Sequence, residues 1–201
     1  MVKMFRASIR SICFISLALI LLFVSVSAFA QAPTELHAQE YEIFSEVIRK
    51  TAVLSESRNV VVSDTTSRDA FLVFDVSKEF QRKLNKLQKS TLESFRKANK
   101  AEGKLRQEFA DDLVVHLMPW SDSVNSLGRL SGDKDAAAKY AAEYRLTFSR
   151  VGFNKEMTQA LVHVDYRHNE MRKYAFGSYF LFSRQNDGAW EVVNIVRSWV
   201  Y

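Results

Sequence analysis

The last quarter of the chain decides the fold, and residues 144–201 read YRLTFSRVGFNKEMTQALVHVDYRHNEMRKYAFGSYFLFSRQNDGAWEVVNIVRSWVY. Four of its segments are rich in β-branched and aromatic residues: 144–149, 160–166, 174–182 and 189–199. In the first, apolar side chains fall on every second position, which is the period of a strand with one face on a core. The stretch therefore predicts four antiparallel strands that follow one another along the chain.

Turn and bulge residues separate or interrupt these segments. Gly152 predicts a loop after the first strand, because glycine adopts positive φ at little cost. Gly188 follows an aspartate, and an Asp-Gly pair suits a tight hairpin turn before the last strand. Gly177 predicts either a bulge in the third strand or a close approach of another backbone. The register of the last strand stays ambiguous, and a bulge near Val192–Val193 would resolve it.

The segment 160–166 has two unlike faces, because side chains alternate along a strand. One face is apolar and consists of Ala160, Val162, Val164 and Tyr166. The other face consists of Leu161, His163, Asp165 and Arg167. We expect the first face to pack on the core and the second to be the wetter one.

Residues 1–30 have the three parts of a secretory leader. A basic start precedes the apolar run 12–24, which is short for a membrane span, and an Ala-x-Ala site ends at Ala30. Cleavage after Ala30 would leave 31–201 as an exported domain with no stable membrane span. The alternative is an uncleaved anchor, because the apolar run can be extended to Phe29.

Removal of the leader weakens two signals in the composition. The chain has 28 Lys and Arg against 23 Asp and Glu, a formal charge of +5, and Lys3, Arg6 and Arg10 lie in the leader. Subtracting these 3 from 28 leaves a net charge of +2, which is weak evidence for nucleic acid or an anionic membrane. The one cysteine, Cys13, also leaves. The mature chain then has no disulfide, thiolate metal site or cysteine nucleophile.

Helical periodicity dominates the sequence upstream. Segment 40–48 has apolar residues at the spacing of an amphipathic helix, namely Tyr41, Phe44, Val47 and Ile48. This helix is the best candidate to cover the sheet. Segment 76–87 repeats the pattern, and Ser90 with Glu93 has the spacing of a capping box, which predicts a new helix. The inward residues of that helix would be Leu92 and Phe95.

Shorter segments complete the expected fold. The β-branched run 59–63 predicts a strand, whereas 113–117 fits either a strand or a helical turn. Segment 121–135 has the composition of a loop, and 135–143 that of a short helix. No internal repeat or long linker divides 31–201. We therefore expect one α+β domain, with N-terminal helices packed on one face of a C-terminal antiparallel β-meander of about four strands.

The stretch Ser149–Asn154, Ser-Arg-Val-Gly-Phe-Asn, resembles a family of small uncharacterised exported bacterial proteins. Looser similarity covers 41–48, 60–66, 91–99 and 159–162. The resemblance implies export and an α+β fold, and it supplies no activity. Family members often have a glycine-rich, sometimes cysteine-bearing segment where this chain has 166–173. This chain has no cysteine there, so no redox or disulfide role is implied.

Four polar residues are candidate ligand-binding residues: Asp64, Arg150, Asn154 and His163. Arg150 could hold a carboxylate or phosphate through its planar guanidinium, or it could form an ion pair with Asp64 that closes the loop. The alternative for Asp64 is a turn in which it bonds nearby amides. His163 and Asp165 could place two metal ligands on one strand face, or His163 could be an ordinary solvated histidine. No histidine pair has the i, i+4 spacing of a helical zinc site, so we predict no metal.

The sequence does not specify a reaction. It contains no glycine-flanked serine elbow and no glycine-rich phosphate loop. We therefore expect a non-catalytic domain of the cell envelope or exterior, periplasmic or extracellular, that binds an unknown protein or small molecule without a cofactor or nucleic acid. The alternative is a carboxylate-dependent hydrolase that acts on an envelope or extracellular polymer through acids such as Asp64. The question of enzyme or binding domain stays open, with binding favoured.

Overall fold

The computed structural model describes residues 35–52, 59–68, 82–119, 144–168 and 175–200. The chain divides into two units, 1–32 and 33–201, and the described residues all belong to the second. Three predicted features lie outside them: the leader, the loop and helix at 121–143, and the first half of the amphipathic segment 76–87.

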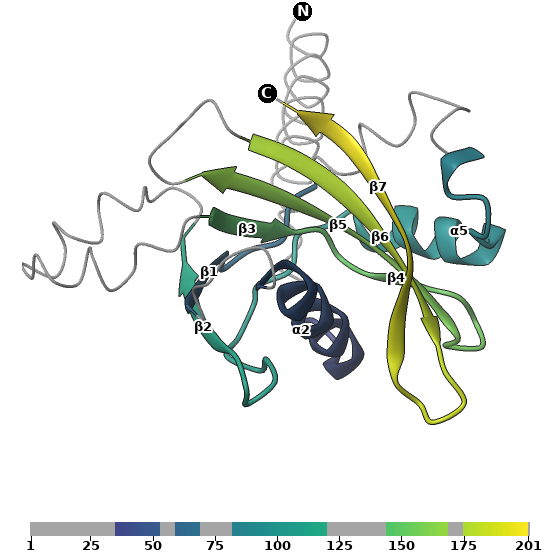
Figure 1. The fold of residues 1–201 in the computed structure, drawn as a ribbon, viewed down its shortest axis with the longest axis horizontal. Coiled ribbons are helices and arrows are strands. Elements are labelled where there is room, and N and C mark those ends of the chain that lie inside the picture. Colours follow the sequence, from purple (N-terminus) through teal and green to yellow (C-terminus); the bar gives the residue numbers. More distant parts are fainter. Residues whose placement is uncertain (1–34, 53–58, 69–81, 120–143, 169–174, 201) are drawn as a thin grey trace, which may run out of the picture. The chain divides into compact units, whose positions relative to one another are not determined.

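Seven strands form one sheet (Figure 1). They are β1 Asn59–Ser63, β2 Val114–Met118, β3 Tyr144–Phe148, β4 Gly152–Phe153, β5 Gln159–His168, β6 Ala175–Arg184 and β7 Trp190–Val200. Their order is β2-β1-β3-β5-β6-β7, with β4 paired to β5. β1 is parallel to both β2 and β3, and the other pairs are antiparallel. The sheet is therefore mixed.

The α+β class is confirmed, but the expected sheet was too small. The four predicted C-terminal strands appear as β3, β5, β6 and β7. The upstream strands β1 and β2 extend this part of the sheet through parallel pairing. The undecided segment 113–117 belongs to β2, and part of the loop expected at Gly152 forms the short strand β4.

The helix predicted over 40–48 is α2, Ala38–Ala52. Its four expected inward residues, Tyr41, Phe44, Val47 and Ile48, are all buried. They share a core cluster with the apolar face of β5, and the ring of Phe44 stacks on that of Phe148 at 4.5 Å. The amphipathic pattern therefore places α2 correctly.

The second described helix, α5, is Lys89–Ala98, and the capping box predicted for it is absent. Its N-cap is Gln88, without a side-chain cap bond. Instead, Gln159 of β5 reaches the helix start: its Oε1 accepts hydrogen bonds from Gln88 N and from Thr91 Oγ1, both at 2.8 Å. Gln159, which is distant in sequence, therefore caps the start of the helix, the role that the capping box predicts for Ser90.

α5 packs closely on β4 and β5. A Cβ on Gly152 would lie 2.3 Å from the backbone nitrogen of Phe95, so only glycine allows this approach. Phe95 is buried as predicted, while Thr91 is buried in place of Leu92, which is half-buried. The close packing fixes α5 against the segment that links β3 to β5.

The two helices contribute to different core clusters, so the expectation that the helices share one face of the sheet is wrong. α2 packs with Val162 and Val164 in the first cluster, whereas α5 contributes Phe95 to a second cluster with Leu161. Val162 and Leu161 are neighbours on β5 and point to opposite faces. The face that we expected to be wet is buried at Leu161 because α5 and residues of β6 and β7 pack there.

The hairpin turn predicted at Gly188 is confirmed, and the ladder is irregular beside Gly177, although the extra residue there, Ser198, lies on β7 and not on the third predicted strand. Gly188 has a φ of +87°, and its amide donates to Gln185 O at 3.0 Å in the β6–β7 hairpin. The β6–β7 ladder shifts register at two places, after Gly177 and after Leu181. The second shift leaves Val193 as the extra residue on β7, which resolves the ambiguous register of that strand.

The described helices are short: α2 has 15 residues and α5 has 10. Within the described ranges, no helix combines the length and the apolar character that crossing a membrane requires.

Candidate functional site

Arg150 forms a buried ion pair, and its partner is Glu40 in the first turn of α2. Arg150 Nη2 donates to Glu40 Oε1 at 2.6 Å, and Nε donates to Oε2 at 2.9 Å. The side chains are only 7% and 2% exposed. The alternative that paired Arg150 with Asp64 is therefore wrong, because α2 supplies the carboxylate.

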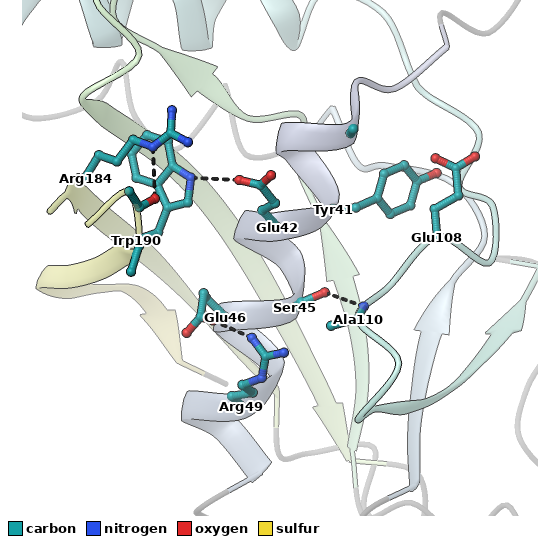
Figure 2. A pocket seen from close by; sticks show the side chains of 12 residues that line it. Tyr41, Glu42, Ser45, Glu46, Arg49, Glu108, Ala110, Arg184 and Trp190 are labelled. Atoms are coloured by element: carbon teal, nitrogen blue, oxygen red, sulfur yellow. Dashed lines mark hydrogen bonds and ion pairs between the residues drawn. The ribbon is translucent and has the colours of Figure 1, made fainter. Parts of the chain in front are cut away.

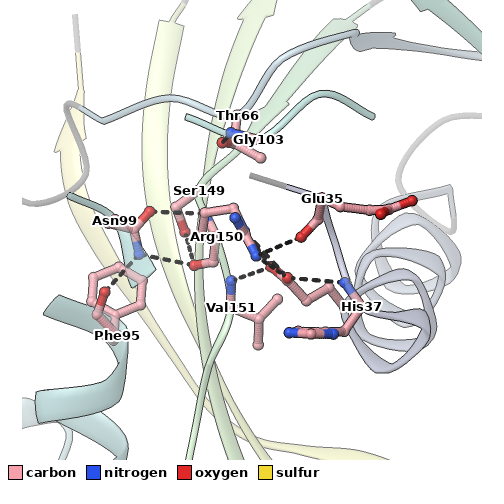
Figure 3. Close-up of polar contacts among 10 residues, drawn as sticks. Glu35, His37, Thr66, Phe95, Asn99, Gly103, Ser149, Arg150 and Val151 are labelled. Atoms are coloured by element: carbon pink, nitrogen blue, oxygen red, sulfur yellow. Dashed lines mark hydrogen bonds and ion pairs between the residues drawn. The ribbon is translucent and has the colours of Figure 1, made fainter. Parts of the chain in front are cut away.

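The backbone around Arg150 is held from two sides (Figure 3). Arg150 N donates to Asn99 Oδ1 at 2.8 Å, and Asn99 Nδ2 donates to Arg150 O at 3.0 Å. Val151 N donates to Glu40 Oε2 at 3.0 Å. We call Glu40, Asn99, Arg150 and Val151 the Arg150 clasp. Its polar groups bind one another, so the clasp is a structural feature rather than an open anion site.

Asp64 has a different partner from both of those expected. Its carboxylate forms an ion pair with Lys104, whose side chain is 58% exposed. The backbone of Asp64 also joins two segments: its amide donates to Met118 O at 2.9 Å, and its carbonyl accepts from Leu105 N at 2.8 Å. Within the described residues, the side chain pairs with Lys104 and with no nearby amide, contrary to the expected turn.

Asn154 organises the loop between β4 and β5. Its Oδ1 accepts hydrogen bonds from Thr158 N at 2.8 Å and Gln159 N at 2.9 Å. Its Nδ2 donates to Thr158 Oγ1 at 2.8 Å and to Gln88 Oε1 at 3.0 Å. Because both ends of the amide bind the scaffold, Asn154 holds its own loop against the start of α5.

His163 is buried, so the expectation of a solvated histidine is wrong: its exposed fraction is 1%. His163 Nε2 lies 2.9 Å from Ser198 Oγ on β7. The other ring nitrogen, Nδ1, lies 3.7 Å from Asp165 Oδ1, which is beyond hydrogen-bond distance. Among the described residues, Nδ1 is one of two buried side-chain nitrogen or oxygen atoms without a hydrogen-bond partner. Burial lowers the pKa of His163 to about 3.

We call Ser198, His163 and Asp165 the His163 row. It belongs to a polar part of the sheet face that α2 does not cover, to which β1 and β3 contribute Ser63, Arg145 and Thr147. The aromatic ring of Tyr179 lies 4.4 Å from the imidazole. Ser149, next to Arg150, accepts a hydrogen bond from His163 N at 2.9 Å. The segment that carries the Arg150 clasp therefore also fixes the backbone of His163.

An open pocket of about 520 Å³ lies where α2 meets the β6–β7 hairpin (Figure 2). Its lining consists of Ala38, Tyr41, Glu42, Ser45, Glu46, Arg49, Glu108, Ala110, Arg184, Gly188, Ala189 and Trp190. We call it the α2 pocket. Its volume falls within the range of small-molecule sites, about 300–1,000 Å³. None of the four candidate residues from the sequence lines it.

Polar contacts hold the walls of the α2 pocket in place (Figure 2). Trp190 Nε1 donates to Glu42 Oε2 at 3.2 Å, which joins the hairpin to the helix. The guanidinium of Arg184 lies 5.5 Å from the centre of the Trp190 ring. Ala110 N donates to Ser45 Oγ at 3.0 Å and closes the third wall.

Arg49 is held at the same pocket by two acids. It binds Asp112 through two hydrogen bonds, of 2.9 Å from Nε and 2.6 Å from Nη2, and it also pairs with Glu46. The hydrogen bond from Arg49 lowers the pKa of the Asp112 carboxyl. The lining thus presents carboxylates and guanidinium groups around an aromatic wall. Such a set can bind and orient a polar ligand.

Metal-ligating side chains do not gather in the part of the chain that the structure describes. No three of its His, Cys, Asp or Glu residues lie close enough together to hold an ion.

Sequence reasoning missed the residues that complete these sites. Glu40 is one turn into an ordinary amphipathic helix, and nothing local marks it as the partner of Arg150, 110 residues away. Trp190 and Glu42 meet across 148 residues. Ser198 lies in a bulge whose position depends on the β6–β7 register. Alternation did reveal that His163 and Asp165 share a face.

Comparisons with known proteins do not identify the chain: no family model matches it, and neither does any curated protein or solved structure.

Proposed function

We propose that this chain is an exported binding domain of the cell envelope or exterior, and that the α2 pocket holds its ligand. The observation that carries the proposal is the pocket itself, with about 520 Å³ of space between α2, the hairpin and Ala110. Export rests on the leader in residues 1–30, and it leaves the periplasm and the exterior as the two locations. The ligand is a small polar molecule or a side chain of a partner protein.

The charges of the lining indicate the chemistry of the ligand. Three carboxylates, Glu42, Glu46 and Glu108, line the α2 pocket with two guanidinium groups, Arg49 and Arg184. Glu46 is paired with Arg49, which is itself held by Asp112 outside the lining. Among the described lining residues, carboxylates outnumber guanidinium groups by one, so a ligand that carries an amine or another cationic donor fits best.

Preorganisation supports binding. Glu42, Ser45 and Arg49 are already held by hydrogen bonds that join different segments. A ligand that enters such a site pays little to order its walls, because their positions are fixed before it arrives. A pocket with fixed polar walls at the junction of a helix and a hairpin suits recognition.

The resemblance to small exported bacterial proteins remains part of this proposal. The stretch Ser149–Asn154 supports it physically, because almost every polar group in it has a defined task. Arg150 binds Glu40, Asn154 closes its loop, and Gly152 admits α5. A family that shares this stretch would share the structural joint between α2, α5 and the sheet, whatever ligand each member binds.

A thermal-shift screen tests the proposal. Purified protein is heated with sugars, amines, short peptides, nucleotides or metal salts, and a binder at 100 times its Kd stabilises the fold by about 2.7 kcal/mol. For a domain of this size that raises Tm by roughly 5–10 °C. Glu42→Gln keeps an acceptor for Trp190 but removes the charge, so it should weaken binding by roughly tenfold or more.

A matched control is Glu93→Gln, which changes an exposed acid of α5 outside the pocket. It should leave the ligand-induced shift unchanged. The proposal fails if no compound raises Tm, or if a compound that does so acts equally on Glu42→Gln.

The second candidate function is hydrolysis, and one observation favours it. The carboxylate-dependent hydrolase that the sequence allowed requires Asp64 as a catalytic acid. In the structure, Asp64 forms an ion pair with Lys104. In its place, the structure brings a histidine between an acid and a hydroxyl in the His163 row. This chemistry differs from the carboxylate-pair mechanism that the sequence allowed.

A further inference from the structure

The His163 row is assembled over a point of β6 that has no side chain. His163 and Asp165 are two residues apart on β5, so both project from the same face. Their partners across the ladder are Tyr179 and Gly177. Because glycine adds no side chain to this face, groups from β5 and β7 can meet above Gly177.

A bulge on β7 provides the third member. The ladder skips Ser198, which lies between the partners of Gly177 and Ser178. Bulges redirect a side chain and are over-represented beside active sites. Here the redirected hydroxyl reaches across β6 and lies 2.9 Å from His163 Nε2.

The imidazole is arranged to accept the proton of Ser198. A neutral histidine has one donor and one acceptor nitrogen. The tautomer with its hydrogen on Nδ1 directs that hydrogen towards Asp165 Oδ1, 3.7 Å away, and leaves the lone pair of Nε2 for Ser198. Catalytic hydrogen bonds are often long before substrate binds, so this distance suits an empty site. Burial lowers the pKa of His163, so the ring is neutral and Nε2 is free of a proton; the nearby Asp165 carboxylate is what would favour the imidazolium as it forms.

The three residues of the row differ in solvent exposure in the way that an acyl-transfer site requires. Ser198 is partly exposed, while His163 and Asp165 are buried at 1% and 6%. A nucleophile must be reached by substrate, whereas the base and the acid that orients it act better when shielded from water. A purely structural hydrogen bond has no need of this order.

We propose that Ser198, His163 and Asp165 form an acyl-transfer centre that cleaves small carboxylic esters. Ser198 Oγ attacks the carbonyl carbon while its proton moves to His163 Nε2. The bond to the alcohol oxygen breaks, and the alcohol leaves with that proton. Water then attacks the acyl-serine by the same route, which releases the carboxylic acid and returns the proton to Ser198. Asp165 orients the imidazole and stabilises its charged form.

This activity goes beyond ligand binding at the α2 pocket and does not depend on it. No described lining residue of that pocket belongs to the row, so each site can be tested alone. Success or failure of the thermal-shift screen leaves the prediction for Ser198 unchanged.

Labelling with a fluorophosphonate probe tests the centre. The full purified chain is incubated with the probe, whose phosphorus binds an activated serine oxygen as fluoride leaves, and the adduct is located by peptide mass spectrometry. We expect a single adduct on Ser198, absent in Ser198→Ala. Ser183→Ala, a partly exposed serine of β6, and Glu42→Gln should label like the parent chain. His163→Gln should label roughly 100-fold more slowly, the loss expected for a general base.

Several outcomes would overturn the proposal. They are the absence of any adduct on Ser198, equal labelling of the Ser198→Ala chain, and labelling of a folded His163→Gln chain at the parent rate. Ser198→Ala removes one partly exposed hydroxyl and keeps the strand, so the test stands even if His163→Gln does not fold. Nitrophenol release from p-nitrophenyl acetate gives a second readout: its burst reports acylation of Ser198, its steady phase reports hydrolysis of the acyl-serine, and both should be lost in Ser198→Ala.

Discussion

The Arg150 clasp and the His163 row are both buried and polar, but they differ in how completely their groups are paired. In the clasp, the guanidinium of Arg150 meets both oxygens of Glu40, and the neighbouring amides bind Asn99 and Glu40. In the row, Nδ1 of a histidine with 1% exposure has no hydrogen-bond partner among the residues that the structure describes. Ser149 connects the two, since it precedes Arg150 and binds the amide of His163.

The difference separates structural from functional candidates. A buried polar group without a partner costs roughly 1–3 kcal/mol, so folded proteins rarely keep one without a reason. The clasp needs no further explanation, because its bonds fix three segments of the chain. The row retains an unpaired nitrogen beside a hydroxyl and an acid. The proposed acyl-transfer role would give this nitrogen a task, because it would face Asp165 during proton transfer.

The largest expected effect comes from breaking the clasp. Arg150→Met leaves the Glu40 carboxylate buried without its cation, and removal of one partner of a buried pair costs roughly 3–5 kcal/mol. Urea unfolding followed by circular dichroism would measure the loss in the free energy of unfolding.

The control is the double variant Glu40→Leu with Arg150→Met. It replaces the pair by apolar groups, which is often nearly neutral, although Val151 N then loses its acceptor. We expect the double variant to recover most of the loss. If Arg150→Met cost less than about 1 kcal/mol, the clasp would behave like an exposed ion pair, and its structural role would be wrong.

An effect of intermediate size is expected from His163. Its lowered pKa should make the free energy of unfolding depend on pH. Its pKa is about 3 in the folded chain, against an ordinary value of 6.5. Between these values the unfolded chain binds a proton that the folded chain does not. Stability is therefore complete above pH 6.5 and falls as the pH drops towards 3, by up to about 1.4 kcal/mol per unit.

The difference between parent and His163→Gln isolates this contribution. Asp165 and Tyr179, which face the imidazole, are present in both chains, so their contributions largely cancel in the difference. Between pH 6.5 and 5 the parent should lose about 1.5 kcal/mol more than the variant. His37→Gln, at the exposed start of α2, should keep the parent slope. Equal slopes for parent and His163→Gln would mean that water reaches the ring and that the row is open.

Sequence alone predicted the elements whose signal is local. The period of two gave β3, β5, β6 and β7, and helical spacing gave α2 with its inward residues. The Asp-Gly pair predicted the hairpin at Gly188, and Gly177 marked a place where the ladder shifts register, although the extra residue lies opposite it on β7. In each case the pattern and the structural cause lie within a few residues of each other.

The predictions that were wrong concern residues whose partners are distant in the chain. The start of α5 is fixed by Gln159 rather than by Ser90, because a β5 side chain reaches Gln88 and Thr91. The face of β5 that was expected to be wetter is buried at Leu161, because the close approach at Gly152 lets α5 pack there. Sequence brought His163 and Asp165 together, but only the register of three strands adds Ser198.

The smallest expected effect tests pairing without full burial. Asp64 and Lys104 form an ion pair like that of the clasp, but the lysine is 58% exposed. Exposed pairs contribute about 0–1 kcal/mol, so Asp64→Ala should lower the free energy of unfolding by less than about 1 kcal/mol. The loss should shrink further in 0.5 M salt, because ions screen charges near the surface. A loss close to that of Arg150→Met would show that charge pairing stabilises this fold irrespective of burial, and the large effect expected for the clasp could then not be attributed to its burial.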